Sequence, residues 1–410
     1  MTGNICIETA DTLHAPASLG ARAASWSGVF AMTVCVFTLI ASEFLPVSLL
    51  SPMAADLRIT EGMAGQGIAI SGAFAVLTSL SISSLTAGMN RKTLLLLLTG
   101  LMAASGGIVA LAPNFVTYMI GRALLGIVVG GFWSMSAAIA IRLVPRNQVP
   151  RAMAIFNGGN ALATVIAAPL GSWLGGVVGW RGAFLGLLPI ALIALVWQWI
   201  SLPSMAPEPR RAGSGNSVFG LLRHRVVTLG MLAVGAFFMG QFALFTYLRP
   251  FLETVTQVNV TILTMTLLVI GVAGFIGTAV IGTLLKINLY KTLVAIPLVM
   301  AAIAVALIFF GGTLALVVVL LGIWGLVATA APVGWWSWVA RTMPQDAEAG
   351  GGLMVAVIQL SIALGSTIGG LLFDLSGYAS AFGVSAAILA VAALLAMFAR
   401  RAESESTSLL

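Results

Sequence analysis

Residues 291–310 read KTLVAIPLVMAAIAVALIFF, in which a single lysine precedes a run of uncharged, mostly apolar residues. An α-helix needs about 20 such residues to cross the hydrocarbon core of a membrane. Lipid offers the backbone no hydrogen-bond partner, so only helices and closed barrels span it, and this run is too long and too continuously apolar for a barrel strand. The stretch therefore predicts a transmembrane helix.

The same pattern recurs on both sides of this stretch until it fills most of the chain. Hydrophobic residues make up 60% of the 410 residues and charged residues 8%, whereas soluble domains carry about 25% charged residues. Charged or Pro/Gly-rich breaks separate the apolar runs. Together they predict an all-α integral membrane protein with 12 transmembrane helices, at 28–53, 62–87, 93–111, 114–140, 152–177, 182–201, 226–250, 259–285, 291–310, 314–340, 350–372 and 379–399.

The longest polar interval follows the sixth predicted helix and covers residues 202–225. It is rich in proline, glycine and serine, a composition typical of a flexible linker. The predicted organisation is a tail at 1–26, a six-helix half at 27–201, this cytoplasmic linker, a second six-helix half at 226–399 and a tail at 400–410.

The two predicted halves carry related motifs in equivalent helices. GFWS at 131–134 recurs as GWWS at 334–337, and GSWLGG at 171–176 recurs as GSTIGG at 365–370. Chance similarity of glycine-rich helices is the alternative, but two matches at similar offsets favour a repeat. Two parallel six-helix repeats around a site at mid-membrane are the plan of major facilitator transporters. We therefore expect a pseudo-symmetric transporter of this type.

Lysine and arginine residues indicate how the helices are oriented in the membrane. Most of the 19 Lys and Arg residues lie on the same side as both chain ends, including Arg142 and Arg151. Because such residues favour the cytoplasmic side, both termini are predicted to be cytoplasmic. Residues 1–26 lack a basic start followed by an apolar run, so we expect a tail there rather than a signal peptide.

Two ionisable residues fall deep inside predicted helices. Glu43 lies in the first helix, roughly 15 Å below the outer surface, and Arg122 lies in the fourth at roughly 12 Å. A charge at such a depth is costly and marks a functional hypothesis. Arg122 stays charged, whereas Glu43 can gain or lose a proton. The pair is interpreted either as a proton-coupling site or as a permanent ion pair that only fixes helix packing.

Uncharged polar and aromatic residues also lie within the predicted helices. The amides are Asn160, Gln241 and Gln359, which either join helices to one another or contact a ligand in a central cavity. Aromatic rings at similar depth can stack on a flat ligand such as a nucleobase, or they pack against helices and lipid. The candidates for substrate contact are the three amides with Phe132, Trp133 and Trp336.

Three sequence motifs resemble those of the drug:proton antiporter branch of the major facilitator superfamily, over residues 27–400. YMIGRALLG at 118–126 resembles motif B, whose arginine, here Arg122, is implicated in proton transfer. The segment with Pro169, Gly171 and Gly175 resembles the antiporter motif C, with alanine where glycine usually precedes the proline. These residues also permit a bend and close helix approach, and we assign them a conformational role.

The third motif, motif A between the second and third helices, is degenerate. Arg91 and Lys92 match its basic end, but Asn90, Gly88 and Ala87 stand where Gly, Arg and Asp are expected. The resemblance assigns Arg91 and Lys92 a conformational role. The missing acid puts the charge latch of the outward-facing state in doubt, not the fold.

Longer strings resemble bacterial purine ribonucleoside efflux pumps. They are EFLPVSLL at 43–50, GGFW at 130–133, GQF at 240–242, PVGW at 332–335 and VAVIQL at 355–360. The resemblance implies export of inosine-like nucleosides or purine analogues in exchange for protons, across a bacterial inner membrane. It implies no cofactor beyond the proton gradient. We expect a monomer.

Other classes of protein are weighed against this interpretation. A broader drug or sugar exporter would use the same fold. A passive channel is disfavoured by the repeat and the lone acid. A membrane enzyme is disfavoured because the sequence offers no cluster of catalytic residues: the two histidines, His14 and His224, have no cluster of acids or cysteines grouped with them. The net charge of +7 is spread over loops, which disfavours nucleic-acid binding, and no metal site is predicted.

Overall fold

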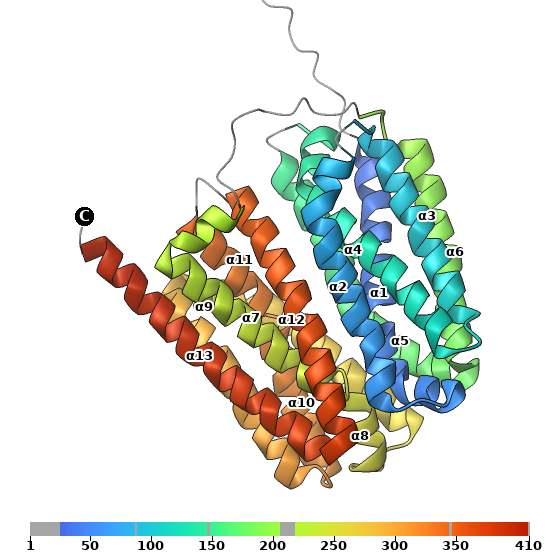
Figure 1. Ribbon diagram of the computed structural model, residues 1–410, viewed down its shortest axis with the longest axis vertical. Coiled ribbons are helices and arrows are strands. Elements are labelled where there is room, and N and C mark those ends of the chain that lie inside the picture. Colours follow the sequence, from blue (N-terminus) through green and yellow to red (C-terminus); the bar gives the residue numbers. More distant parts are fainter. Residues whose placement is uncertain (1–24, 87, 146–147, 206–217, 344–346, 409–410) are drawn as a thin grey trace, which may run out of the picture.

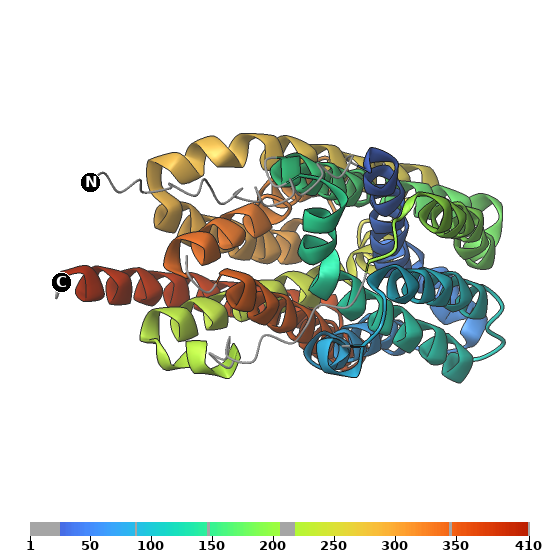
Figure 2. The ribbon, with the colours of Figure 1, turned by 90° about the horizontal axis from the view of Figure 1, so that it is seen from above.

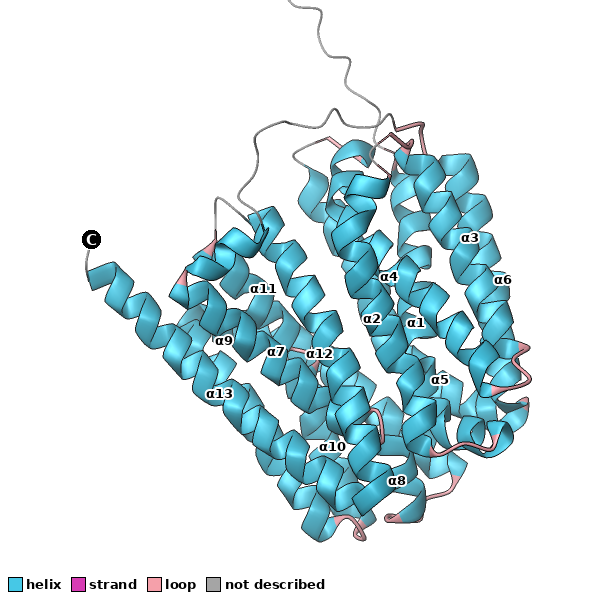
Figure 3. Cartoon of the chain, in the orientation of Figure 1, coloured by secondary structure: helices cyan, strands magenta, loops and turns pink. Residues whose placement is uncertain are grey.

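The computed structural model describes residues 25–86, 88–145, 148–205, 218–343 and 347–408, and in these ranges the chain is helical with no strand. Figure 3 shows long helices joined by short loops. A short 3-10 helix, η2 (Val218–Arg223), precedes the seventh α-helix. The α-helices are α1 (Trp26–Leu57), α2 (Glu61–Leu85), α3 (Arg91–Ala110), α4 (Phe115–Leu143), α5 (Val149–Val177), α6 (Gly179–Ser201), α7 (Arg225–Phe245), α8 (Leu248–Thr254), α9 (Val260–Phe310), α10 (Leu314–Ala328), α11 (Ala331–Thr342), α12 (Ala347–Ser376) and α13 (Tyr378–Ser408).

The helices form two groups that lie side by side (Figure 1). We call α1–α6 the first bundle and α7–α13 the second bundle. Each has its own apolar core, and seen from above the blue and teal helices lie mainly to one side of the orange and red ones (Figure 2). The bundles meet mainly through α2 against α12 and α5 against α9.

The predicted number of membrane spans is confirmed, although one helix contains two of them. Eleven segments of the described ranges are long and apolar enough to cross a membrane. One of them, α9, has 51 residues, about 77 Å at 1.5 Å per residue, which is more than two hydrocarbon cores. Asn288 interrupts it with φ −162° and ψ 102°, and its side-chain oxygen accepts a hydrogen bond from Lys291 N at 2.9 Å. Asn288 thereby caps a separate helix, which gives 12 spans.

Two helices that the sequence predicts as continuous are broken in the structure. The predicted helix at 226–250 is divided into α7 and α8, and the one at 314–340 into α10 and α11. A proline follows each break. Pro250 provides no N–H for the carbonyl of Thr246, and Pro332 provides none for that of Ala328, so neither helix continues regularly through these points.

The segments outside the two halves differ from their prediction or lie beyond the described residues. Helix α13 continues to Ser408, so residues 400–408 are helical rather than the start of a separate tail. The last part of the predicted linker forms η2. Residues 1–24 of the N-terminal tail and 206–217 of the linker lie outside the described residues.

Candidate functional site

Arg122 binds α1 at a point where a proline leaves a carbonyl without its helical donor. Pro46 lies within α1 and has no N–H to give the carbonyl of Ser42, four residues earlier. The buried Arg122 guanidinium donates to Ser42 O at 2.8 Å from Nη1 and to Glu43 O at 3.2 Å from Nη2. Its Nε donates to Gly67 O on α2 at 2.9 Å. Arg122 therefore ties α1, α2 and α4 together through the backbone.

The Glu43 carboxyl lies toward the second bundle rather than on Arg122. It is buried, and Gln359 Nε2 on α12 donates to Glu43 Oε1 at 3.3 Å. Between these two described side chains, Glu43 and Arg122, the structure shows no ion pair; the guanidinium reaches the glutamate only through its backbone carbonyl. The side-chain partner of Glu43 therefore comes from the other bundle, which the sequence reasoning missed.

An aromatic contact between the bundles involves Phe44, the residue that follows Glu43. Phe44 on α1 stacks on Phe242 on α7, with ring centroids 5.8 Å apart and an interplanar angle of 27°. Gln241 precedes Phe242, and its Oε1 is buried with no hydrogen-bond partner among the described residues. Gln359 Oε1 is in the same situation. The interface thus offers stacked apolar rings and, at Gln359, a buried acceptor without a donor in the described part of the chain.

Other predicted substrate contacts lie elsewhere. Phe132 is buried in the core of the first bundle, and Trp133 packs edge-on against it at 6.0 Å. Asn160 on α5 is partly buried. Trp336 is 45% exposed on α11. In this conformation the structure does not bring these four residues to the contact between Glu43 and Gln359.

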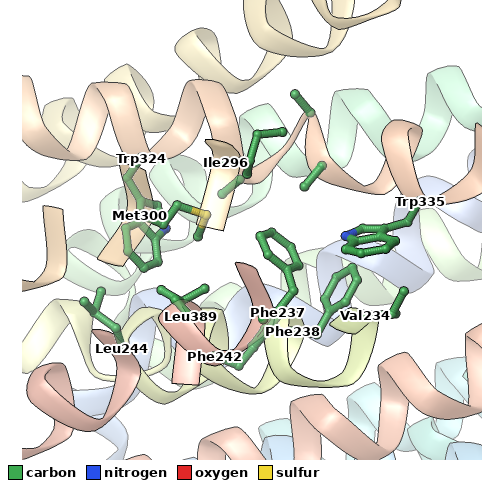
Figure 4. Packing of buried hydrophobic residues seen from close by; sticks show 14 of the residues in the cluster. Val234, Phe237, Phe238, Phe242, Leu244, Ile296, Met300, Trp324, Trp335 and Leu389 are labelled. Carbon is green, nitrogen blue, oxygen red and sulfur yellow. The ribbon is translucent and has the colours of Figure 1, made fainter. Parts of the chain in front are cut away.

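Two further deep tryptophans belong to the core of the second bundle. In Figure 4, Trp335 lies beside Phe238 and Val234, and Trp324 lies beside Met300. Both tryptophans are almost fully buried among these apolar residues. They stabilise the bundle and do not face the neighbouring one.

Glycines of α5 allow close contact with α1. A Cβ on Gly171 would lie 2.4 Å from Leu45 Cδ1 and 2.6 Å from Ser48 Oγ, and one on Gly175 would lie 2.4 Å from Leu49 Cδ2. Real Cβ contacts are not this short, so a larger residue at either position would require these α1 side chains to shift. Pro169 lies two residues before Gly171 within the same helix.

Arg91 and Lys92 begin α3. The helix is capped by Asn90, whose Oδ1 accepts a hydrogen bond from Lys92 N at 2.9 Å. Arg91 Nη1 donates to Thr86 Oγ1 at 3.3 Å. Position 87, where the resemblance expects an acid, lies outside the described residues.

Arg249 on α8 repeats the arrangement of Arg122, but it crosses between the bundles. Pro52 leaves the carbonyl of Ser48 on α1 without its helical donor, and Arg249 Nη1 donates to that carbonyl. Arg249 is buried, and its Nε donates to Glu253 Oε1 at 2.8 Å. The proline four residues after Ser48 is the signal in the sequence that could have predicted this contact.

Asp374 on α12 makes a third polar contact between the bundles. Its Oδ1 accepts a hydrogen bond from Gly62 N at 3.0 Å, and its Oδ2 accepts one from Thr60 Oγ1. Both donors lie at the N-terminus of α2, where the helix dipole favours an anion. A Cβ on Gly62 would lie 2.2 Å from Asp374 Oδ2, so glycine leaves room for the carboxylate.

The hydrogen bonds between the bundles share one location. Thr367 also donates to Gln66 at 3.2 Å, and Thr264 to Ser172 at 3.1 Å. The hydrogen bonds named above between the bundles lie between the level of Glu43 and the end opposite Trp26 and Ser408. We call this the closed end. In Figure 1 the bundles meet there and diverge toward the other end.

A pocket of about 620 Å³ lies away from this interface, at the opposite end of the second bundle. It is lined by residues of α9, α11 and α13, among them Lys286, Asn288, Arg341 and Glu403. Arg341 and Glu403 form an ion pair across it at 3.4 Å. This pocket does not include the contact between Glu43 and Gln359.

Comparison with known families decides the class of the protein. The profile described as Major Facilitator Superfamily matches residues 32–351. The chain belongs to this superfamily. Its relatives and structural neighbours in the superfamily include transporters of small molecules, and the chain is a membrane transporter rather than an enzyme.

Two similar relatives have names that indicate different functions, transport and transcription regulation. The purine ribonucleoside efflux pump NepI of Salmonella paratyphi B is 40% identical over 375 residues, which cover 92% of this chain and 94% of the relative. The transcription regulatory protein OpdE of Pseudomonas aeruginosa is 65% identical over 385 residues, covering 93% and 96%.

Solved structures of the superfamily show the same fold. A bacterial homologue of the human lysosomal transporter Spinster, in an inward-facing and occupied conformation, has a TM-score of 0.75 at 15% identity, covering 91% of this chain and 96% of that one. The human organic anion transporter MFSD10 has a TM-score of 0.65 at 18% identity, covering 91% and 99%.

Proposed function

We propose that this transporter exports purine ribonucleosides such as inosine, or purine analogues, across a bacterial inner membrane in exchange for protons. The support for the substrate class is the 40% identity to a purine ribonucleoside efflux pump over 92% of the chain. The proton gradient would be the only driving force, without a cofactor, and the working unit would be a monomer in the lipid bilayer.

The observation that carries proton coupling is the position of the Glu43 carboxyl. It is a buried, titratable group on α1, in contact with Gln359 on the other bundle. Alternating access in this superfamily is a rocking of one half against the other. A carboxyl at the contact between the moving parts gains or loses its partner as they move, so its proton occupancy and the conformation influence each other.

The distribution of basic residues supports an orientation for this conformation. Arg91 and Lys92 begin α3, and Arg142 and Arg151 flank the break between α4 and α5, all at the end opposite the closed end. Since such residues favour the cytoplasm, we place both termini there. The closed end is then periplasmic, and the transporter is closed to the outside.

A broader exporter of drugs or sugars is the second candidate. The specific observation in its favour is the stacked Phe44 and Phe242, an apolar surface that fits many flat ligands, and adaptable apolar surfaces favour promiscuity. The name of the OpdE relative raises a regulatory role as well. For this chain we propose that any effect on transcription follows from transport of a small molecule.

Transport in liposomes tests the proposal. Purified protein is reconstituted, and labelled inosine and internal pH are followed together under an imposed proton gradient. We expect uphill inosine movement that requires the gradient. Glu43→Gln should abolish uphill movement and keep downhill exchange, while Glu61→Gln, at the start of α2, should behave as wild type. An absence of inosine transport would overturn the proposed substrate class. It would favour the broader exporter, which a panel of drugs and sugars would then test.

A further inference from the structure

The contact between Glu43 and Gln359 is incomplete as it stands. Gln359 uses its Nε2 to donate to Glu43 Oε1 at 3.3 Å, but its own Oε1 is buried without a hydrogen-bond partner among the described residues. A buried acceptor without a donor is costly, because water satisfied it before burial. Gln359 Oε1 therefore needs a hydrogen-bond donor from a neighbouring group.

The protonation state of Glu43 decides whether that donor exists. An ionised carboxylate has acceptors only, whereas a protonated carboxyl adds one O–H donor. With the proton on the second carboxyl oxygen, the O–H can donate to Gln359 Oε1 while Gln359 Nε2 donates to Glu43 Oε1. The acid and the amide then form a ring of two hydrogen bonds. Without the proton, the Glu43 carboxylate has no donor to offer, and Gln359 Oε1 stays without a partner at this contact.

Arg122 does not supply the missing interaction. Its guanidinium donates to the carbonyls of Ser42, Glu43 and Gly67, and among the described residues no hydrogen bond joins it to Gln359. The other charged groups on the neighbouring helices lie toward helix ends: Asp56 on α1, Glu61 on α2, Arg91 and Lys92 on α3, Arg142 on α4, Arg151 on α5, Arg181 on α6, Arg225 on α7, Arg249 and Glu253 on α8, and Asp374 on α12.

We propose that this conformation holds Glu43 in its protonated form through a two-bond pair with Gln359, and that loss of the proton breaks the pair and releases the bundles. The proposal rests on the proposed proton coupling at Glu43. It makes Gln359 a positioning residue for the proton rather than a substrate contact. The proton would enter while the now-closed end is open and leave to water at the opposite end, where the O–H bond breaks.

Difference infrared spectroscopy on the purified full chain tests the pair directly. We expect the C=O stretching band of a protonated carboxyl that disappears in Glu43→Gln. In Gln359→Met, which keeps a similar shape, the band should shift to the frequency of an acid without a hydrogen-bond partner. Gln66→Met, which alters another amide between the bundles, should leave the band in place. An unchanged band in Gln359→Met would overturn the pair.

Distances between spin labels test its effect on the bundles. Leu111→Cys and Phe310→Cys place labels at exposed positions of the closed end, in a chain with Cys6 and Cys35 replaced by serine. We expect the ratio of closed to open molecules to rise about tenfold as the pH falls, to stay high at every pH in Glu43→Gln, and to lose its pH dependence in Gln359→Met. Retained pH dependence in Gln359→Met would contradict the proposal.

The proposed function and the Glu43–Gln359 pair can be disproved independently of each other. If inosine transport is independent of protons but the infrared band responds to Gln359→Met, the proposed function falls and the pair stands. If transport is proton-coupled through Glu43 and the band ignores Gln359, the function stands and the pair falls.

Discussion

At the scale of single residues, two arginines act as replacements for the N–H groups that prolines lack. Pro46 leaves Ser42 O to Arg122, and Pro52 leaves Ser48 O to Arg249. Buried carbonyls need a donor. Each arginine therefore donates to the carbonyl that the proline four residues later leaves without one. For Arg122 this coupling explains why a cation is buried without an ion pair to the Glu43 carboxylate, and it can be tested.

Replacing the proline should rescue loss of the arginine. Arg122→Met should destabilise the protein, because buried carbonyls lose their donors at about 1 to 3 kcal/mol each. Adding Pro46→Ala supplies a backbone N–H for Ser42 O and should restore about 1 kcal/mol of that loss. Thermal unfolding in detergent measures the difference.

The control for this prediction is Pro52→Ala, which changes a different carbonyl. Combined with Arg122→Met it should give no rescue. Equal rescue by both proline substitutions would show that the proline and arginine are not coupled through Ser42.

At the scale of helices, glycine spacing brings α5 onto α1. Gly171→Ala puts a Cβ 2.4 Å from Cδ1 of the buried Leu45 side chain, which must shift, and moving a buried side chain away from its preferred rotamer costs about 1 kcal/mol. We expect a lower unfolding temperature and slower inosine exchange. Gly100→Ala, in α3 with nothing within 4 Å of the added Cβ, should lower neither. Equal losses at both positions would mean that helix flexibility, not close packing, matters at Gly171.

The contact of α8 with α1 predicts how the closed end responds to mutation. Arg249→Met removes the donor to Ser48 O and should shift the bundles toward opening at that end, by about tenfold in the population ratio. Spin-label distances between Leu111→Cys and Phe310→Cys measure the shift. Arg58→Met, which removes a cation at the end of α1, should cause no shift, and a similar shift there would point to net charge instead.

At the scale of the whole molecule, six hydrogen bonds join the bundles at the closed end, and alternating access predicts that the bundles separate there during transport. A short thiol-specific linker between Gln66→Cys and Thr367→Cys, whose native side chains are in contact, should stop inosine transport. Cleavage of the linker should restore it. The same linker within the second bundle, between Thr246→Cys and Ser366→Cys, should leave transport active. Transport through the first linked pair would contradict separation of the bundles.

Much of the fold could be predicted because it depends on local composition. The 12 spans follow from apolar runs, and the halves from the linker and the repeated motifs. The breaks at Thr246 and Thr329 were missed, although Pro250 and Pro332 were visible, because a proline inside a helix either bends it or ends it depending on its surroundings. Asn288 was placed correctly in a break because Lys286 and Lys291 flank it.

The sequence by itself determined which residues are exceptional: Glu43 and Arg122 are the ionisable groups that lie deep inside a span, and membrane burial makes such groups rare. Only the tertiary structure decided their partners. Arg122 binds carbonyls, Glu43 meets Gln359, and Phe132 and Trp335 are buried within their bundles. The physical reason is that the depth of a residue follows from its position along a helix, whereas its contacts depend on which faces of different helices meet. A helix that is apolar on all sides gives no sequence signal of which face meets which neighbour.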